Sequence, residues 1–249
     1  MANPFKPTFG ATPPLLAGRD DQIADFADAL DDGPGSAGRA TLYTGARGAG
    51  KTVMLNAVED EARTRGWLVV SETSDNNLTR KLTESRLPAL LQELDPEAVT
   101  RRLTQFNLPV ISGGIGWETI EAHVVKMDLR QQITLITDLL AENETGLLIT
   151  VDEVHRDQTE ALRELVTVVQ HAFREDRELA FVAAGLPPAV NELLNDNILT
   201  FLRRADRHNL GAVSLGHVRD AILTPITQNG RDVDGDALEL MVESTGGYP

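Results

Sequence analysis

The feature that most constrains this chain is a short glycine-rich segment, Gly45 to Thr52, with the sequence GARGAGKT. It fits the pattern G-x-x-x-x-G-K-[ST], in which glycines allow backbone N–H groups to converge on a phosphate. For this composition, independent placement of residues predicts only about 0.003 such matches in the whole chain. A glycine-rich turn without a ligand is the alternative interpretation.

The flanks of this segment favour phosphate binding. Ala40 to Thr44 is predicted to form a short strand, and the apolar spacing that follows predicts a helix over Thr52 to Arg65. A strand, a glycine-rich turn and a helix in this order are what a phosphate-binding loop requires. The helix N-terminus adds the positive end of its dipole to the site.

Each residue of the loop has an expected role. Lys51 is expected to neutralise the β and γ oxygens of a nucleotide, and the Thr52 hydroxyl to bind Mg²⁺. Arg47 has two interpretations, a solvated side chain or a phosphate contact. The full predicted nucleotide-binding set of the loop is Gly45, Ala46, Arg47, Gly48, Ala49, Gly50, Lys51, Thr52 and Val53.

A second motif consists of the apolar run Leu147 to Val151 followed by Asp152 and Glu153. A buried strand that ends in two carboxylates is the form expected of a Walker B element. Asp152 would hold Mg²⁺, and Glu153 would orient and polarise the attacking water as the catalytic base. Acidic residues also end strands without any function, but the upstream phosphate loop favours the functional interpretation.

The remaining apolar runs predict the rest of a sheet. Trp67 to Thr73 and Leu179 to Ala184 are predicted strands, and a fifth is expected near Asn209 to Val213. Runs that do not alternate with polar residues indicate strands buried on both faces, as in a parallel sheet between helices. The strand at Trp67 to Thr73 lies between the two motifs in sequence, which disfavours a kinase or a small GTPase.

Helices are predicted between these strands. The predicted helical segments are Leu78 to Phe106 with a break at Asp95-Pro96, a helix over residues 129–140, a helix capped by Asp157 and Glu160 that ends near Arg174, and a short helix from Pro187. Leu108 to Trp117 is expected to be a loop or hairpin. We therefore expect an α/β fold, a three-layer αβα P-loop NTPase with a parallel five-stranded sheet over residues 1–213.

The last part of the chain, residues 214–249, is expected to be the beginning of a helical lid. Ser214 is predicted to cap a helix of about fourteen residues, and Asp236 to begin the final helix. The apolar faces of the two helices include Val218 and Leu238, and we expect that the helices cannot cover these faces alone. The faces would pack on the core or on helices of a longer natural sequence.

Composition excludes several classes of function. The chain has no cysteine, which excludes a disulfide framework, thiolate metal sites and a cysteine nucleophile, and which fits the cytoplasm. The net charge of −15 disfavours indiscriminate binding to nucleic acid or to an anionic membrane. The 5 histidines show no metal-type spacing. His155 alone stands out, because it follows Glu153 by two residues at the functional end of its strand.

Taken together, the two motifs resemble those of AAA+ ATPases, near the origin-recognition-type and archaeal-type ATPases and the STAND signalling NTPases. The resemblance covers most of the chain and implies ATP and Mg²⁺ as ligands. Leu16 to Ile23 resembles the "GRxxEI" segment that packs by the adenine in this family, with Arg19 at the arginine position and Gln22 in place of the usual Glu. A helix start capped by Asp20 is the alternative for this segment.

The resemblance also assigns roles near the end of the chain. Arg204, just before the fifth strand, falls where such families carry an arginine finger for the γ-phosphate of a neighbouring subunit, although a surface helix ending in basic residues is the rival interpretation. The ending, with Pro249, resembles the G-x-P element that touches the nucleotide from the lid in STAND proteins. The fourth strand ends at Gly185 without the polar sensor residue common in AAA+ proteins, which implies slow turnover.

Three functions follow from the motifs and the resemblance. The first is a Mg²⁺-dependent ATPase in which Lys51, Glu153 and Arg204 act in hydrolysis and which changes conformation. The second is a regulatory switch of the STAND type, and the third is a DNA-associated loader or transposition helper. The expected partners are ATP and, with ATP bound, further copies of the chain; nucleic acid is expected only through a missing domain, and no membrane association is expected.

Overall fold

The computed structural model describes residues 16–94, 96–105, 127–155, 159–195 and 200–248, together with positions 3, 5 and 120. Its strands are β1 (Ala40–Thr44), β2 (Leu68–Thr73), β3 (Leu147–Val154), β4 (Leu179–Gly185) and β5 (Asp206–Asn209). They form one five-stranded sheet in the order β2-β3-β4-β1-β5, and every neighbouring pair is parallel. The predicted parallel sheet is confirmed.

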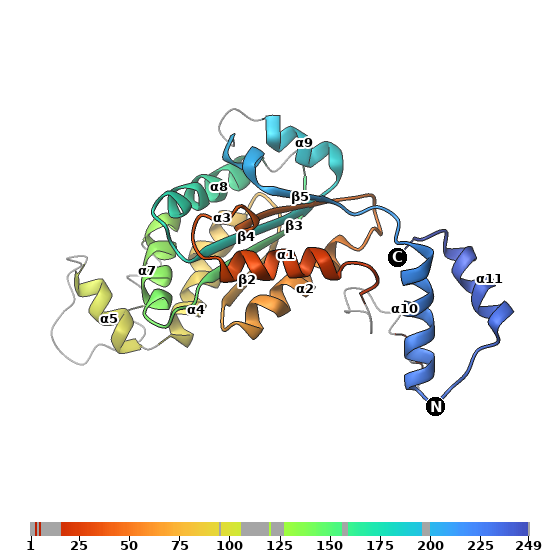
Figure 1. Ribbon diagram of the computed structural model, residues 1–249. Helices are drawn as coiled ribbons and strands as arrows, with labels where there is room; N and C mark the ends of the chain where they lie inside the picture. The colour runs from red at the N-terminus through yellow and green to blue at the C-terminus, as the bar shows by residue number, and fades with distance from the viewer. Residues whose placement is uncertain are drawn as a thin grey trace.

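Helices cover both faces of the sheet (Figure 1). The α-helices are α1 (Asp20–Asp31), α2 (Lys51–Thr64), α3 (Leu78–Lys81), α4 (Leu87–Glu93), α5 (Pro96–Gln105), α7 (Leu129–Ala141), α8 (Thr159–Arg174), α9 (Pro187–Asn195), α10 (Leu215–Gln228) and α11 (Gly235–Thr245). Short helical turns are η1 (Ala37–Arg39), η2 (Leu82–Arg86) and η4 (Thr200–Arg204). None of the helices in the described part of the chain combines the length and apolarity that a membrane span requires.

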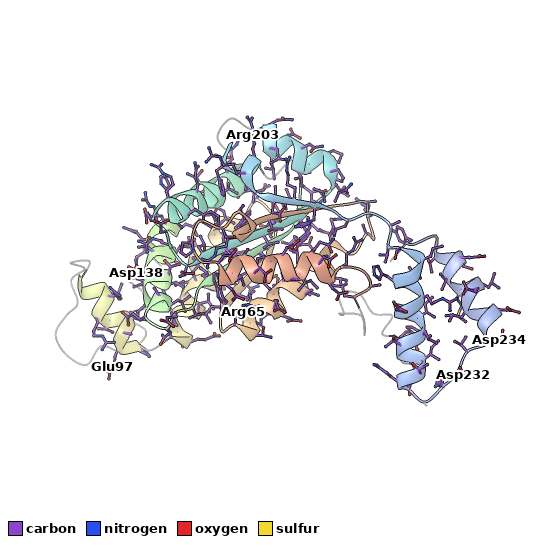
Figure 2. The ribbon with its side chains drawn as sticks, in the orientation of Figure 1. Arg65, Glu97, Asp138, Arg203, Asp232 and Asp234 are labelled. Atoms are coloured by element: carbon purple, nitrogen blue, oxygen red, sulfur yellow. The ribbon has the colours of Figure 1, made fainter. Side chains whose placement is uncertain are left out.

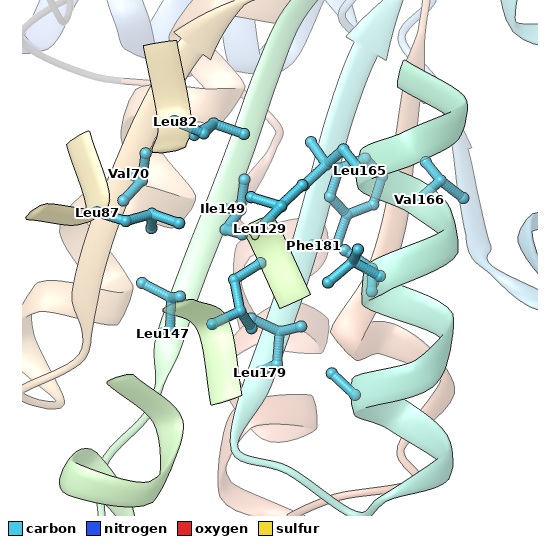
Figure 3. Close-up of a cluster of buried hydrophobic side chains, with 14 of the residues drawn as sticks. Val70, Leu82, Leu87, Leu129, Leu147, Ile149, Leu165, Val166, Leu179 and Phe181 are labelled. Atoms are coloured by element: carbon cyan, nitrogen blue, oxygen red, sulfur yellow. The ribbon is translucent and has the colours of Figure 1, made fainter. Parts of the chain in front are cut away.

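The central strands are buried from both sides, which explains their unbroken apolar sequence. In β3, Leu148 belongs to the apolar cluster that contains α1 and α2 residues, whereas Leu147 and Ile149 belong to the larger cluster beneath α7 and α8. Figure 3 shows this larger cluster, in which Phe181 of β4 packs with Leu165 of α8. Side chains of alternate residues on one strand therefore enter two separate cores.

The edge strand β5 corrects one prediction. The fifth strand is expected near Asn209 to Val213, but β5 ends at Asn209 and covers four polar residues. Among the described strands it pairs with β1 alone, at the edge of the sheet, and its residues alternate between half-buried and exposed in place of an apolar run. His208 is half-buried on β5, and its ring lies 5.4 Å from that of Tyr43.

The region after β2 agrees with the predicted break before Pro96, where α5 begins. The first helical segment contains a π-helical turn, η2, which the sequence pattern does not reveal. The carbonyl of Thr83 in this turn accepts a hydrogen bond from the Gln132 amide of α7 at 3.0 Å. A partner distant in sequence thus binds a backbone carbonyl of the irregular turn. Asp95, Asp157 and the segment Leu108 to Trp117 lie outside the described residues.

Helices α10 and α11 form a small unit beside the sheet domain (Figure 1). Ser214 caps α10 as predicted, and α11 begins at Gly235, one residue before the predicted start at Asp236, with Asp234 as its N-cap. Val218 and Leu238 are buried in a cluster that also contains Val213 of the connecting segment. The apolar faces are therefore covered partly by each other and partly by the segment that leads from the core, while α11 also presents exposed apolar and acidic side chains.

The acidic stretch at the start of α11 is exposed, as Figure 2 shows for Asp232 and Asp234. Asp234 accepts hydrogen bonds from the backbone N–H groups of Asp236 and Ala237, at 3.0 Å and 3.2 Å. Negative charge at a helix N-terminus is stabilising because it faces the positive end of the helix dipole. The stretch is thus a solvated surface in which one residue is also a helix cap.

Candidate active site

The phosphate loop connects β1 to α2 at the carboxyl edge of the sheet. Gly48 and Gly50 have φ angles of +75° and +84°, values that side chains with a Cβ rarely adopt. Gly50 is the N-cap of α2, so Lys51 is the first helical residue. The loop and the first turn of α2 thus have the arrangement expected of a phosphate cradle, and phosphate binding itself stays a prediction.

The side chains of Lys51 and Thr52 take up two different positions at this cradle. The Lys51 Nζ atom lies 3.1 Å from the carbonyl oxygen of Gly45 and 2.7 Å from that of Ala46. The Thr52 hydroxyl donates a hydrogen bond of 2.6 Å to Oδ2 of Asp152. The two predicted motifs, which are 100 residues apart in sequence, are therefore in direct contact.

Asp152 and Glu153 lie in an irregular part of β3. The pairing of β3 with β4 shifts register between Val151 and Val154, and Glu153 has a φ of +53°. Such a conformation costs a residue with a Cβ about 1–3 kcal/mol and is typical of functional sites. The turn exposes the Glu153 side chain, while Oδ1 of Asp152 accepts the Glu153 backbone N–H at 2.7 Å.

A cavity of about 560 Å³ joins these groups. Its lining residues are Arg47, Gly48, Gly50, Lys51, Thr52, Val53, Asp152, Glu153, Val154, His155, Gly185 and Leu186. Its volume lies in the range of pockets that bind small molecules and cofactors. Arg47 is exposed at this cavity, which leaves both of its interpretations open.

Thr52 and Asp152 are the residues that could hold a magnesium ion. Their hydroxyl and carboxylate oxygens are ligands that Mg²⁺ prefers. Within the described ranges, three or more His, Asp or Glu side chains never gather as a metal-binding cluster. A magnesium ion would therefore take its remaining ligands from water and from nucleotide phosphates, as is usual for this ion.

Arg19 lies away from the cavity lining. It is 8% exposed, and its Nη2 atom donates to the carbonyl of Gly211 at 2.6 Å. Burial lowers the pKa of this guanidinium. Asp20 begins α1 without capping it, so the alternative of an Asp20 cap is wrong. Arg19 instead ties the start of α1 to the segment that leads to α10, and its predicted contact with a nucleotide stays a prediction.

Tyr248 is a residue of this region that the sequence patterns miss. Its hydroxyl donates a hydrogen bond to the carbonyl of Arg47. A Cβ atom on Gly48 would lie 2.0 Å from the Tyr248 hydroxyl oxygen, so this close approach also requires glycine. The segment after α11 thus touches the phosphate loop. Pro249, the predicted nucleotide contact, lies outside the described residues.

Replacing Tyr248 with phenylalanine is expected to loosen the unit formed by α10 and α11. Loss of one hydrogen bond destabilises a closed arrangement by about 0.5–1.5 kcal/mol, which corresponds to about 2–12-fold more frequent opening. Hydrogen exchange of the amides of α11 measures this opening. Exchange in β3 should stay unchanged, and equal exchange of α11 in both proteins would show that the contact has no role.

Arg204 lies near the amino ends of the parallel strands β1 and β5, whereas the phosphate loop follows the carboxyl end of β1. It precedes β5, in which Asp206 pairs with Thr41 near the start of β1. A strand advances by about 3.3 Å per residue, so the length of β1 separates Arg204 from the loop by about 16 Å. Arg204 is exposed and lines a second cavity of about 650 Å³. It therefore does not reach the cavity beside Lys51 in its own chain.

The neighbouring Arg203, labelled in Figure 2, is held in place by a backbone contact. Its Nε atom donates to the carbonyl of Leu194 in α9 at 2.8 Å. Arg204 has no such hydrogen bond or ion pair with any residue of the described ranges. Of the two arginines, Arg204 is the one whose guanidinium is available to a second molecule.

Several solved structures share this fold. Cdc6p from Pyrobaculum aerophilum matches with a TM-score of 0.52 and 16% identity over 96% of this chain and 57% of that chain. ORC1 from Aeropyrum pernix, solved in complex with DNA, matches with a TM-score of 0.50 and 16% identity over the same shares. AMPPCP-bound DnaA from Aquifex aeolicus matches with a TM-score of 0.53 and 13% identity over 92% of this chain and 57% of that chain.

The chain thus spans 57% of the length of each of these three structures. None of the curated proteins compared with the sequence matches it. A family model described as "AAA ATPase domain" matches residues 15–182, which is more than half of the chain. The chain therefore belongs to the AAA ATPase domain family.

Proposed function

We propose that this protein binds ATP together with Mg²⁺ and hydrolyses it. The observation that carries the proposal is the convergence of Lys51, Thr52, Asp152 and Glu153 on one cavity of about 560 Å³. These four side chains supply a cation for the phosphates, oxygen ligands for the metal and a base for water. Membership in the AAA ATPase domain family supports the same reaction.

Each of these four residues would have a different role in hydrolysis. Thr52 and Asp152 would hold magnesium, which when bound neutralises charge on the β and γ oxygens. The Lys51 ammonium would leave the two loop carbonyls for the phosphates, because hydrogen bonds to charged acceptors are stronger. Glu153 would accept a proton from the water whose oxygen bonds to the γ-phosphorus, as the bond from phosphorus to the ADP oxygen breaks.

The contact between Tyr248 and the phosphate loop supports a role for hydrolysis in conformational change. A nucleotide that moves the loop backbone at Arg47 would alter the acceptor of the Tyr248 hydroxyl. The unit of α10 and α11 would then change its position relative to the sheet. The chain would convert the state of its nucleotide into a position of these helices.

A regulatory switch is the second candidate, and the end of β4 favours it. Ala183, Ala184 and Gly185 offer no polar side chain to the attacking water or the γ-phosphate. Loss of a hydrogen bond to the transition state typically slows an enzyme by about 10²–10³-fold. In this variant of the proposal, ATP binding would set the state of the protein and slow hydrolysis would reset it.

A Mg²⁺-dependent ATPase assay combined with light scattering tests the proposal. We expect phosphate release that requires both ATP and Mg²⁺ and an increase in mass when ATP is bound. We expect no stimulation by DNA, because the net charge of −15 opposes binding to the negatively charged DNA backbone. Phosphate release that does not depend on Mg²⁺ would contradict the assignment of Thr52 and Asp152.

The location of the protein in the cell is a separate point. A cytoplasmic location stays a prediction that rests on the lack of cysteine.

Replacing Arg204 with alanine is expected to leave ATP binding intact and to abolish most hydrolysis. Since Arg204 does not reach the cavity of its own chain, we expect it to act on the γ-phosphate held by a neighbouring copy, where an arginine finger contributes about 10³–10⁵-fold. Mixing Arg204→Ala with Lys51→Ala should restore part of the activity, because one interface of the mixture combines an intact loop with an intact arginine.

Arg203→Ala is the matched control, because the Arg203 guanidinium is engaged with the carbonyl of Leu194. It should hydrolyse ATP at close to the wild-type rate. A fully active protein that stays monomeric with ATP bound would refute the action of Arg204 between subunits.

A further inference from the structure

The wall of the nucleotide cavity at the end of β4 is apolar. Of β4 and the residue after it, only Gly185 and Leu186 line the cavity. Ala184 is fully buried in the core on the side of α1 and α2. No polar side chain from this strand therefore reaches a bound phosphate or the water that attacks it.

The close contact between β3 and β4 accounts for the glycine at this place. Val154 pairs with Gly185 beyond the irregular turn at Glu153. A Cβ on Gly185 would lie 3.0 Å from both Cβ and the carbonyl oxygen of Val154. A side chain at position 185 would therefore crowd Val154, which favours glycine there, and the polar group on this wall comes from another element.

His155 is the polar residue that stands there. It follows Val154 directly, which places it at the same edge of the sheet as Leu186, the residue after Gly185. Both His155 and Leu186 line the cavity that contains Lys51 and Glu153. His155 is half-buried, so it is neither enclosed in the core nor fully exposed to solvent.

The imidazole of His155 has the chemistry that this wall lacks. A neutral imidazole carries one N–H donor and one acceptor, and a charged imidazole carries two donors. Among the residues that the structure describes, His155 has no hydrogen-bond partner, whereas His208 is bonded to Asp206 and His217 to Ser214. A ligand in the cavity could therefore meet a ring nitrogen of His155 as its hydrogen-bond partner.

We propose that His155 is a further catalytic residue of this ATPase and that its imidazole donates a hydrogen bond to the γ-phosphate of bound ATP. The inference rests on the proposed function and extends it by one residue. The contact distinguishes ATP from ADP, which lacks the γ-phosphate, and it stabilises the charge that develops there in the transition state. A group on β3 thus replaces the polar side chain that β4 does not supply.

The test compares the affinities of His155→Ala and the wild type for ADP and for a non-hydrolysable ATP analogue, each with Mg²⁺. We expect the variant to bind ADP within twofold of the wild type and to bind the analogue about tenfold more weakly. The turnover number should fall by about 10²–10³-fold, as for the loss of a group that stabilises transition-state charge. His155→Asn, which keeps an N–H donor, should recover part of both properties.

Two further variants separate this role from a structural one. His171→Ala is the matched control, because His171 is also half-buried but lies on α8 outside the cavity lining. It should keep the wild-type affinities and turnover. Replacing Leu186 with asparagine in the His155→Ala background returns an N–H donor to the same wall from the end of β4, and it should restore preference for the triphosphate.

Each outcome has a distinct meaning. A wild-type protein that binds neither nucleotide would refute the proposed function itself. A wild-type protein that binds and hydrolyses ATP, while His155→Ala keeps its triphosphate preference and turnover, would refute the role of His155 alone. Equal losses of ADP and triphosphate affinity in the folded variant would also refute it. If His155→Ala does not fold, the same comparison is made with His155→Asn. Because this variant keeps an N–H donor, complete loss of its preference for the triphosphate would overturn the donor role.

Discussion

Replacing Lys51 with alanine is expected to abolish the stabilisation of this protein by Mg-ATP while the apo protein remains folded. The Lys51 ammonium contacts loop carbonyls and its side chain belongs to none of the apolar clusters of the described residues, so the change removes the proposed phosphate ligand and no core packing. The wild type should gain about 2.7 kcal/mol at a hundredfold excess of ligand over Kd. Thermal unfolding with and without Mg-ATP measures the difference.

Lys81→Ala is the matched control for this experiment. The Lys81 ammonium forms an ion pair of 2.5 Å with Asp75, away from the cavity. Its loss should alter the apo melting temperature only slightly, because exposed ion pairs contribute about 0–1 kcal/mol and because Arg86 still pairs with Glu72, the second partner of Lys81. The shift on adding Mg-ATP should match that of the wild type. An equal shift in Lys51→Ala would contradict the phosphate-loop assignment.

Replacing Glu153 with glutamine is expected to slow hydrolysis at least ~100-fold without weakening ATP binding. The amide keeps the size of the side chain but cannot accept a proton from water. Because the Glu153 side chain is exposed at the cavity, the fold should be unaffected. Single-turnover hydrolysis and the Kd for ATP, measured on the same preparation, separate the chemical step from binding.

Glu144→Gln is a close control, because Glu144 is also an exposed glutamate with a positive φ, of 55°. It lies before β3, at the other end of the strand, and its change should leave turnover unaltered. Asp152→Asn should behave differently from both. It removes charge from the proposed metal site, so its defect should include a higher Mg²⁺ requirement for binding. Full activity of Glu153→Gln would show that another group is the base.

The sheet core could be predicted because its signals are local. β1, β3 and β4 are buried on both faces, and this requirement produces apolar runs that the sequence displays directly. The phosphate loop is equally local, since its glycines and Lys51 act through neighbouring backbone. These elements together place the Walker motifs at one edge of the sheet.

Other features could not be predicted because they depend on distant partners. β5 has a single neighbouring strand and contains polar residues from Asp206 to Asn209, so hydrophobicity does not reveal it. The bond between Tyr248 and Arg47 joins residues 201 positions apart. The positive φ of Glu153 coincides with a change of register against β4, and no sequence pattern within β3 reveals that change.

The candidate site likewise contains features that the sequence predicts and features that it does not. The pairing of Thr52 with Asp152 is expected from the two motifs, and the structure brings their oxygens to 2.6 Å. Arg19 donates a hydrogen bond to the carbonyl of Gly211 and lies outside the cavity lining, and its contact with a nucleotide stays a prediction.

A crystal structure of the protein with Mg²⁺ and a non-hydrolysable ATP analogue tests the central claim most directly. We predict that the triphosphate occupies the loop from Gly45 to Thr52, with the metal between the Thr52 hydroxyl and the Asp152 carboxylate and with Lys51 moved from the loop carbonyls to the phosphates. A nucleotide bound elsewhere, such as in the cavity at Arg204, or a loop that stays empty at saturating analogue, would contradict the account.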